Sequence, residues 1–168
     1  MVNILKIFTS TILSLSLSLN AIAEENSEQR YSLGLGFGSA YSGVGANFAS
    51  ISQHEMKYIS AGCTKISSSH SSTCGFGLGW IKTDLFDVDN DKHGIGIYIG
   101  KVDEETEAIY NQDIYTTKKQ DVYGAGISYT YFKDGLLASD LNYGVSFHVT
   151  NAEYDDNHGW YFQLGYQF

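Results

Sequence analysis

The feature that most constrains this chain is a period-two alternation that recurs in segment after segment beyond residue 30. Glycine or a small polar residue occupies one set of positions, and an apolar or aromatic residue occupies the other. Alternation of this kind is typical of β-strands with two chemically different faces, and no helical periodicity competes with it in this part of the sequence. The pattern therefore predicts an all-β fold.

Eight segments carry the pattern, and an even number of strands lets both termini of the chain lie on the same side of the barrel. Six of these segments are clear and two, which lie early in the chain, are weaker. The clear segments are 31–38, 74–80, 94–101, 123–132, 137–149 and 160–168, and the weaker ones are 42–49 and 55–63.

The chemistry of the two faces indicates the environment of the strands. A soluble sandwich points its large apolar residues inward and covers its outside with charge. Here the second face is chiefly glycine with a few uncharged polar groups, and charge is concentrated in the connections. This favours a closed antiparallel eight-stranded up-and-down transmembrane β-barrel whose apolar side chains face lipid. Closure is expected because bilayer hydrocarbon offers an unpaired strand edge no partner, and eight strands leave no open pore.

The first residues have the pattern of a secretory signal peptide. Lys6 is the single basic residue of Met1–Ala23, an apolar run covers Ile7–Leu19, and Ala21 and Ala23 fit an A-x-A cleavage site. The apolar run is too short to remain in a bilayer as a spanning helix. We therefore expect a signal peptide at 1–23 and one barrel domain at 24–168, exported through the inner membrane.

The charge balance argues against nucleic acid as a partner. Lys6 is the one charged residue of the expected signal peptide, so the mature chain keeps nine basic and nineteen acidic residues, a formal net charge of −10. Such a chain would be repelled by phosphate backbones, and it has no basic stripe interleaved with aromatic residues.

The two cysteines are expected to form a disulfide. Cys63 and Cys74 flank a segment rich in Ser and Thr, and export would place them in an oxidising compartment. A zinc site would need further ligands beyond the intervening His70, and free thiols are the other alternative. Closing a loop of this length stabilises a fold by about 2–3 kcal/mol in the chain-entropy model.

The last predicted strand carries the one family resemblance. It is apolar or aromatic at alternate positions and ends in phenylalanine: Trp160, Phe162, Leu164, Tyr166 and Phe168. This resembles the C-terminal assembly signal of Gram-negative outer-membrane barrels, and residues 31–168 resemble the small eight-stranded OmpA-type and OmpX/Ail-type group in pattern. The resemblance implies an outer-membrane location, with contacts to lipid and lipopolysaccharide. It also implies that periplasmic chaperones and the barrel assembly machinery are partners during biogenesis.

Polar residues on the inner face are expected to form a lumenal hydrogen-bond network, because buried polar atoms need partners. Its predicted members are Asp140, Asn142, Ser146 and His148 on one strand, with Tyr161 and Gln163 on the next. Ser146 and His148 are similar to the serine and histidine of outer-membrane lipid A deacylases. Residues two apart on a strand stand about 7 Å from one another, however, which is beyond hydrogen-bond reach. We therefore predict no catalytic residue and no cofactor.

One predicted turn resembles a calcium-binding loop but departs from it at two positions. Asp87, Asp89 and Asp91 resemble the start of an EF-hand loop, but Lys92 stands where glycine is required and Tyr98 where the bidentate glutamate belongs. A solvated turn is the expected structure, and no metal site is predicted.

The connections suggest an orientation. If the N-terminus is periplasmic, the outer loops are 39–41, 64–73, 103–121 and 151–157, and the inner turns are 50–54, 82–93 and 133–135. The longer outer loops are acidic and contain tyrosine, which suits contact with a host or ligand, cation bridging to lipopolysaccharide, or merely solubility. Lys118 and Lys119 could contact lipid phosphate directly.

The sequence thus favours a non-enzymatic outer-membrane barrel whose role is structural or lies in surface interaction through acidic, tyrosine-containing extracellular loops. Two alternatives stay open. One is an enzyme that modifies outer-leaflet lipid, and the other is a soluble lipocalin-like barrel that binds a small apolar ligand.

Overall fold

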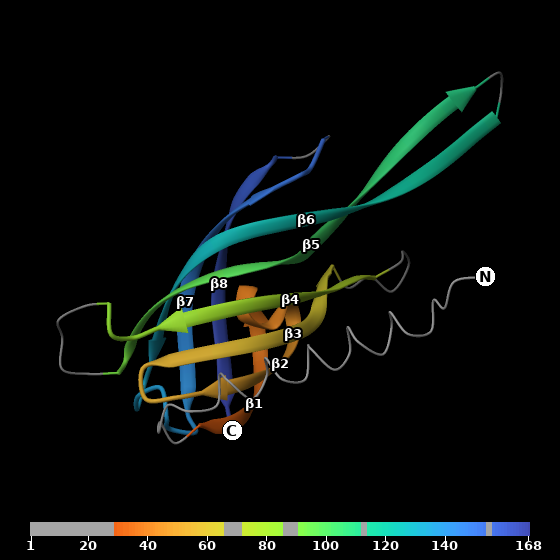
Figure 1. Cartoon of the computed structure of the whole chain (residues 1–168). Helices are drawn as coiled ribbons and strands as arrows, with labels where there is room; N and C mark the ends of the chain where they lie inside the picture. Colours follow the sequence, from red (N-terminus) through yellow and green to blue (C-terminus); the bar gives the residue numbers. More distant parts are fainter. Residues whose placement is uncertain (1–28, 66–71, 86–90, 112–113, 154–155) are drawn as a thin grey trace, which may run out of the picture.

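The computed structural model describes residues 29–65, 72–85, 91–111, 114–153 and 156–168, so the expected signal peptide lies outside the described residues. Eight antiparallel strands follow one another around a closed up-and-down barrel, and β1 pairs with β8 (Figure 1). This confirms the predicted all-β, eight-stranded closed barrel. The strands are β1 (Arg30–Gly38), β2 (Gly43–Ile51), β3 (Glu55–Lys65), β4 (Thr73–Lys82), β5 (His93–Asn111), β6 (Ile114–Phe132), β7 (Leu141–Thr150) and β8 (His158–Gln167).

The alternation in sequence becomes an inside and an outside of the wall. On β1, Leu33 is 49 % exposed while its neighbour Ser32 is 5 % exposed. The register keeps like faces together, since Leu33 stands opposite Phe48 and Gly34 opposite Asn47 in the β1–β2 ladder. Most of the large apolar side chains therefore point away from the barrel axis, and the small and polar ones point into the lumen. A buried apolar cluster that includes Ile51, Met56, Ile81 and Phe132 lies inside the barrel.

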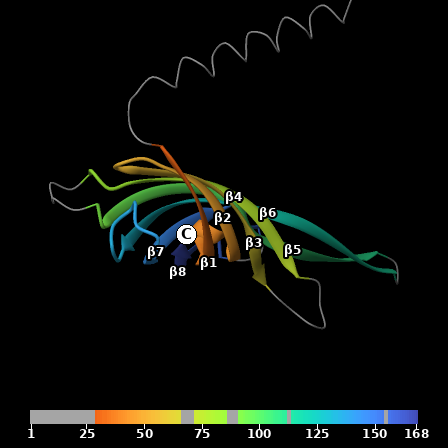
Figure 2. The same cartoon turned by 90° about the horizontal axis from the view of Figure 1, so that it is seen from below.

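The β5–β6 hairpin is longer than the sequence indicated. Residues 103–121 were predicted to be a loop, but their backbone continues the ladder from Asp103↔Val122 to Asn111↔Ile114. Figures 1 and 2 show the hairpin extending beyond the rest of the barrel. The prediction was wrong because the period-two alternation stops near Asp103 while the paired backbone continues, so the ladder is longer than the signal that predicted it.

Strand β7 begins later than predicted. Its expected start was Leu137, but residues 133–140 form a turn in which Gly135 has a φ of 96° and Leu136 is buried. The carboxylate of Asp91 accepts a hydrogen bond from the Leu136 N–H. Lys133 Nζ lies 2.9 Å from Asp140 Oδ2, and this contact, with the Leu141 N–H, lowers the pKa of Asp140 to about 2. The ion pair helps to fix the turn that delays the strand.

The β1–β2 connection enters the lumen. Residues Ser39–Tyr41 were predicted to be an outer loop, but they form a short 3-10 helix, η1, whose three residues are all buried. Gly38 with a φ of 109°, Gly43 with a φ of 98° and the left-handed Ser42 make the two sharp bends that this path requires. The barrel is therefore closed from within by its own first connection.

Tyrosine rings and glycines on the inner face fit together. Tyr58 lies over Gly79 and Tyr98 lies over Gly126, each pair being direct cross-strand neighbours. Tyr41 packs on the pair Gly36–Gly165, where β1 meets β8. A side chain on any of these glycines would overlap a ring or the neighbouring backbone. The glycine-rich face seen in the sequence therefore makes room for the rings that fill the lumen.

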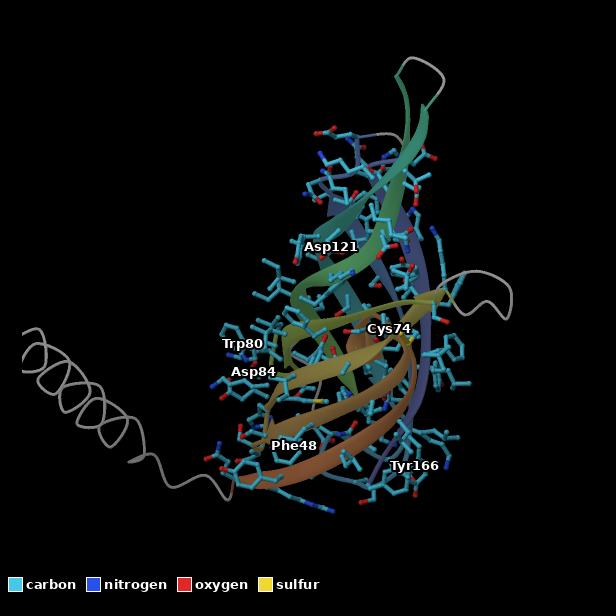
Figure 3. All side chains as sticks on the ribbon, turned by 90° about the vertical axis from the view of Figure 1, so that its right-hand side faces the viewer. Phe48, Cys74, Trp80, Asp84, Asp121 and Tyr166 are labelled. Atoms are coloured by element: carbon cyan, nitrogen blue, oxygen red, sulfur yellow. A yellow bond between two sulfur atoms is a disulfide. The ribbon has the colours of Figure 1, made fainter. Side chains whose placement is uncertain are left out.

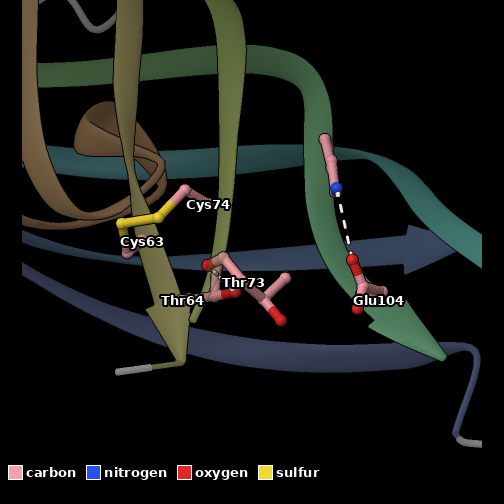
Figure 4. Close-up of a disulfide and its surroundings, with 6 residues drawn as sticks. Cys63, Thr64, Thr73, Cys74 and Glu104 are labelled. Carbon is pink, nitrogen blue, oxygen red and sulfur yellow. Dashed lines mark hydrogen bonds and ion pairs between the residues drawn. A yellow bond between two sulfur atoms is a disulfide. The ribbon is translucent and has the colours of Figure 1, made fainter. Parts of the chain in front are cut away.

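The predicted disulfide is confirmed. Cys63 and Cys74 face one another in the β3–β4 ladder and are bonded, next to Thr64 and Thr73 (Figure 4). The bond closes a connection with a sequence separation of 11. It joins β3 to β4 at the barrel end that also carries the β5–β6 hairpin, which we call the hairpin end. The opposite end, with residues 52–54 and 133–140, is called the turn end.

The packing of Tyr41 on Gly165 yields a stability prediction. The substitution Gly165→Ala should lower the free energy of unfolding by about 1–3 kcal/mol, because the added methyl overlaps the Tyr41 ring in a filled lumen. Urea unfolding followed by tryptophan fluorescence measures this change. Gly77→Ala is the matched control and should cost less, since a methyl there would lie 3.1 Å from the hydroxyl oxygens of Ser42 and Ser60.

A second measurement separates this cause from a general intolerance of alanine in β8. In a Tyr41→Ala background, the added cost of Gly165→Ala should largely disappear, because the ring that it displaces is absent. An equal cost in both backgrounds would contradict the proposed packing.

Candidate functional site

The polar centre of the lumen is built around η1. The Tyr41 hydroxyl donates to Asn142 Oδ1 at 3.0 Å and lies 2.9 Å from Asn142 Nδ2. Gln163 Nε2 donates to Asn142 Oδ1 at 3.4 Å and to Thr130 Oγ1 at 3.3 Å, while its Oε1 lies 3.3 Å from the Ala40 N–H. One network therefore connects η1 with β6, β7 and β8.

A second branch holds the other side of η1. Asn47 Nδ2 on β2 donates to the Ala40 carbonyl at 3.1 Å, and Gln167 Nε2 on β8 donates to Asn47 Oδ1 at 3.1 Å. Ala40 thus has both of its main-chain groups bonded to amide side chains of the wall. The arrangement fixes a plug in the barrel and leaves its centre filled.

The six residues predicted for this network are placed differently. Asn142 and Gln163 belong to its centre, and Ser146 and His148 are buried on the inner face of β7. Tyr161 is half-buried and stacks on His148 with ring centroids 4.5 Å apart. Asp140 lies outside the lumen, in the turn before β7, where it pairs with Lys133.

Sequence reasoning missed Tyr41 and Asn47 as members of the network. Tyr41 was assigned to a surface loop, and Asn47 lies in one of the two weak segments. A usable signal is present in retrospect. Gly38 and Gly43 frame a short connection that contains a large aromatic residue, which is the composition of a turn folded back into a protein.

The Ser146 and His148 pair lacks the geometry of a nucleophile and base. Within the described residues, no hydrogen bond joins Ser146 Oγ to His148. Both side chains point into the lumen and are at most 7 % exposed. A nucleophile needs its base within hydrogen-bond reach, and this pair is not hydrogen-bonded.

The outer wall carries aromatic side chains near both of its ends. Around the turn end these are Tyr31, Phe48, Trp80, Tyr129, Tyr143, Tyr166 and Phe168, and around the hairpin end they are Phe37, Phe76, Tyr123, Trp160 and Phe162, all of them exposed. The ring centroids of Tyr31 and Phe48 are 5.7 Å apart. The ring centroid of Trp160 lies 5.0 Å from that of the half-buried Phe147. Figure 3 shows Phe48, Trp80 and Tyr166 on the part of the wall away from the hairpin.

Charge gathers where the β5–β6 hairpin leaves the barrel. Lys101 lies 2.6 Å from Asp121, Lys119 lies 2.7 Å from Glu104, and Lys65 on β3 lies 2.8 Å from Asp103. Figure 3 shows Asp121 at the base of the hairpin. The first two pairs join β5 to its neighbour β6, and the third reaches from β3 past β4 to β5. They form a charged collar between the apolar wall and the hairpin tip.

The turn that resembles a calcium-binding loop is only partly described by the structure. Asp87 and Asp89 lie outside the described residues, and the Asp91 carboxylate is bonded to the Leu136 N–H. Within the described residues, no group of three or more His, Cys, Asp or Glu side chains is placed to hold a metal ion. In the same residues, no helix is long and apolar enough to cross a membrane.

Comparisons of the chain with protein-family models, with curated proteins and with solved structures found no match. The likeness to OmpA-type and OmpX/Ail-type barrels therefore stays a prediction from the strand pattern.

The lumenal network gives a second stability prediction. Tyr41→Phe should lower the free energy of unfolding by about 1–3 kcal/mol, because it leaves the buried amide of Asn142 short of a partner. Tyr31→Phe is the control, since Tyr31 is 64 % exposed on the outer wall. Urea unfolding midpoints compare the two variants. Equal midpoints would show that the Tyr41 hydroxyl contributes no net stability.

Proposed function

We propose that this chain is an exported outer-membrane β-barrel protein without enzymatic activity, and that its role is structural or lies in surface interaction at the hairpin end. The apolar wall faces the lipid in this proposal. The lumen is a plugged interior, and the β5–β6 hairpin with the neighbouring acidic connections is the part that reaches the exterior.

The observation that carries the proposal is the inverted polarity of the barrel. Large apolar side chains such as Phe162, Phe76 and Ile127 are 76 %, 63 % and 61 % exposed, while Asn142 and Gln163 are 2 % and 4 % exposed. Every strand contributes exposed apolar residues to the wall. A monomer in water seldom exposes contiguous apolar patches beyond a few hundred Å². In lipid the same wall is the expected surface of a barrel.

The aromatic side chains near both ends of the wall support the same location. Outer-membrane barrels carry aromatic girdles at both interfaces. At the turn end, Lys57 Nζ and Lys82 Nζ lie 5.8 and 5.9 Å from the Trp80 ring centroid. Lysines that lie along an apolar surface with their charged ends directed to water are typical of a membrane boundary.

The hairpin supports the surface role. It extends beyond the wall by paired backbone from Asp103 to Asp121, and its base carries the charged collar of Lys101, Glu104 and Lys119. A long paired arm has already lost its backbone entropy on folding, so a partner that binds it orders fewer residues than one that binds a free loop of the same length. Recognition of an extracellular partner is a suitable task for it.

The two alternatives from the sequence have less support. A lipocalin-like barrel needs an apolar cavity, whereas η1 and the amide side chains around Asn142 occupy the centre of this lumen. A lipid-modifying enzyme needs reactive groups that the lipid can reach, whereas Ser146 and His148 point inward.

Cell fractionation tests the location. The protein should appear in the outer-membrane fraction, and unheated samples should migrate differently from boiled ones in SDS, because a closed barrel resists unfolding by detergent until it is heated. Recovery in the soluble periplasmic fraction would refute the proposal.

Labelling with a membrane-impermeant amine reagent tests the orientation. Lys118 on the hairpin should react in intact cells, whereas Lys133 at the turn end should react only after the outer membrane is permeabilised, although its side chain is 55 % exposed. Peptide mass spectrometry distinguishes the two lysines. Labelling of Lys133 in intact cells would reverse the proposed orientation and remove the hairpin from the cell surface.

A further inference from the structure

The barrel wall has a notch at the hairpin end. The β1–β8 ladder stops at Phe37↔Leu164, so in the described part of the chain β8 from Gln163 back to His158 has no partner in β1. On the other side of the gap, β3 extends to Lys65, beyond its last pair with β2 at Val44↔Cys63. The gap holds a cavity of about 180 Å³, which we call the wall notch, lined by Phe37, Gly38, Gly43, Val44, Cys63, Thr64, Tyr161 and Phe162.

The notch is a fixed part of the structure. It exists because the chain turns inward at Gly38 to form η1, and the positive φ angles of Gly38 and Gly43 set both bends. The hydrogen bonds of Asn47 and Gln163 to Ala40 hold η1 in the lumen. Ser39–Tyr41, which would otherwise extend β1 beside β8, therefore lie in the lumen. The Cys63–Cys74 disulfide fixes the opposite rim of the notch.

The two sides of the notch differ in chemistry. Its outer rim is apolar, with Phe37, Val44 and Phe162 exposed at 43 %, 59 % and 76 %. Its inner rim carries the hydroxyl-bearing side chains of Thr64 and Tyr161. Tyr161 also lines two smaller cavities, one beside Ser39 of η1 and one beside His148, so it lies between the notch and the interior.

The charges near the inner rim are already paired. Lys65 lies 2.8 Å from Asp103, and Lys101 lies 2.6 Å from Asp121 and 3.9 Å from Glu104. A charged head group would have to break these pairs or lie beside like charge in a strongly acidic protein. An uncharged group with hydroxyls can instead bond to Thr64, Tyr161 and the unpaired backbone edge of β8.

We propose that the wall notch binds a single-chain amphiphile with an uncharged, hydroxyl-bearing head, of the monoacylglycerol class. The head lies at the inner rim, and the alkyl chain lies along Phe37 and Val44 on the outer wall. The proposal rests on the proposed lipid-facing wall. It adds a ligand site to a protein for which a structural or surface role has been proposed.

Brominated lipid quenching tests the site. Two proteins with one tryptophan each are made in a Trp80→Phe, Trp160→Phe background. Phe162→Trp places the reporter at the notch, and Ile99→Trp places it on β5, where Ile99 is 58 % exposed on the wall. Each is inserted into phospholipid nanodiscs and titrated with a dibrominated monoacylglycerol. The notch reporter should reach half-maximal quenching at a content about tenfold lower than the control, a preference of about 1.4 kcal/mol.

Matched variants and a second probe define the outcomes. Val44→Phe, which fills the notch, should abolish the difference between the reporters, whereas Ile97→Phe on the β5 wall should preserve it. A dibrominated fatty acid ionised at alkaline pH should quench both reporters alike. Equal, non-saturating quenching of both reporters by the monoacylglycerol would overturn the notch site, and stronger quenching of the notch reporter by the fatty acid would overturn the uncharged head.

Nanodisc insertion separates this inference from the proposed function. Protein that does not co-elute with nanodiscs refutes the lipid-facing wall and the notch site together. Protein that co-elutes, shifts with heat in SDS and shows no preferential quenching refutes the notch site alone.

Discussion

The structure depends on the short ladder that closes the barrel between β1 and β8. Four residue pairs, from Gly34↔Gln167 to Phe37↔Leu164, join the two ends of the sheet, with one more bond from the Phe168 N–H to the Leu33 carbonyl. The Tyr41 ring packs on the Gly36–Gly165 pair inside this seam. Without closure, two strand edges would be unpaired, and in lipid each exposed backbone group would cost several kcal/mol.

The path of η1 links three properties of the molecule. Because the chain turns inward at Gly38, the lumen gains a plug bonded to Asn142 and Gln163, the closing ladder stays short, and the wall is left with a notch beside β8. One turn, made possible by two glycines with positive φ, therefore decides the filling of the interior and the shape of the wall together.

Polar side chains gather in the lumen of the barrel, and apolar side chains cover its wall. Buried amide side chains such as Asn47 and Gln167 bond to one another inside the barrel, and most of the large apolar residues face outward. The aromatic residues near the two ends of the wall come from strands that are distant in sequence, Tyr31 and Tyr166 among them. Their alignment around the barrel supports the proposed bilayer location, and no single segment of the sequence contains it.

Period-two alternation is a local property of a strand with two environments, so the sequence alone predicted the strands of the wall and their inward and outward faces. The disulfide was predicted separately, from two cysteines that flank one short segment of a chain expected to be exported. The sequence did not indicate the length of the β5–β6 hairpin, since the outer part of the hairpin lacks the alternation although its backbone is paired. The sequence also did not predict that Tyr41 lies in the lumen or that the wall has a notch beside β8. Those features depend on contacts between residues more than 100 positions apart, such as Tyr41 with Asn142, and only closure of the barrel brings such residues together.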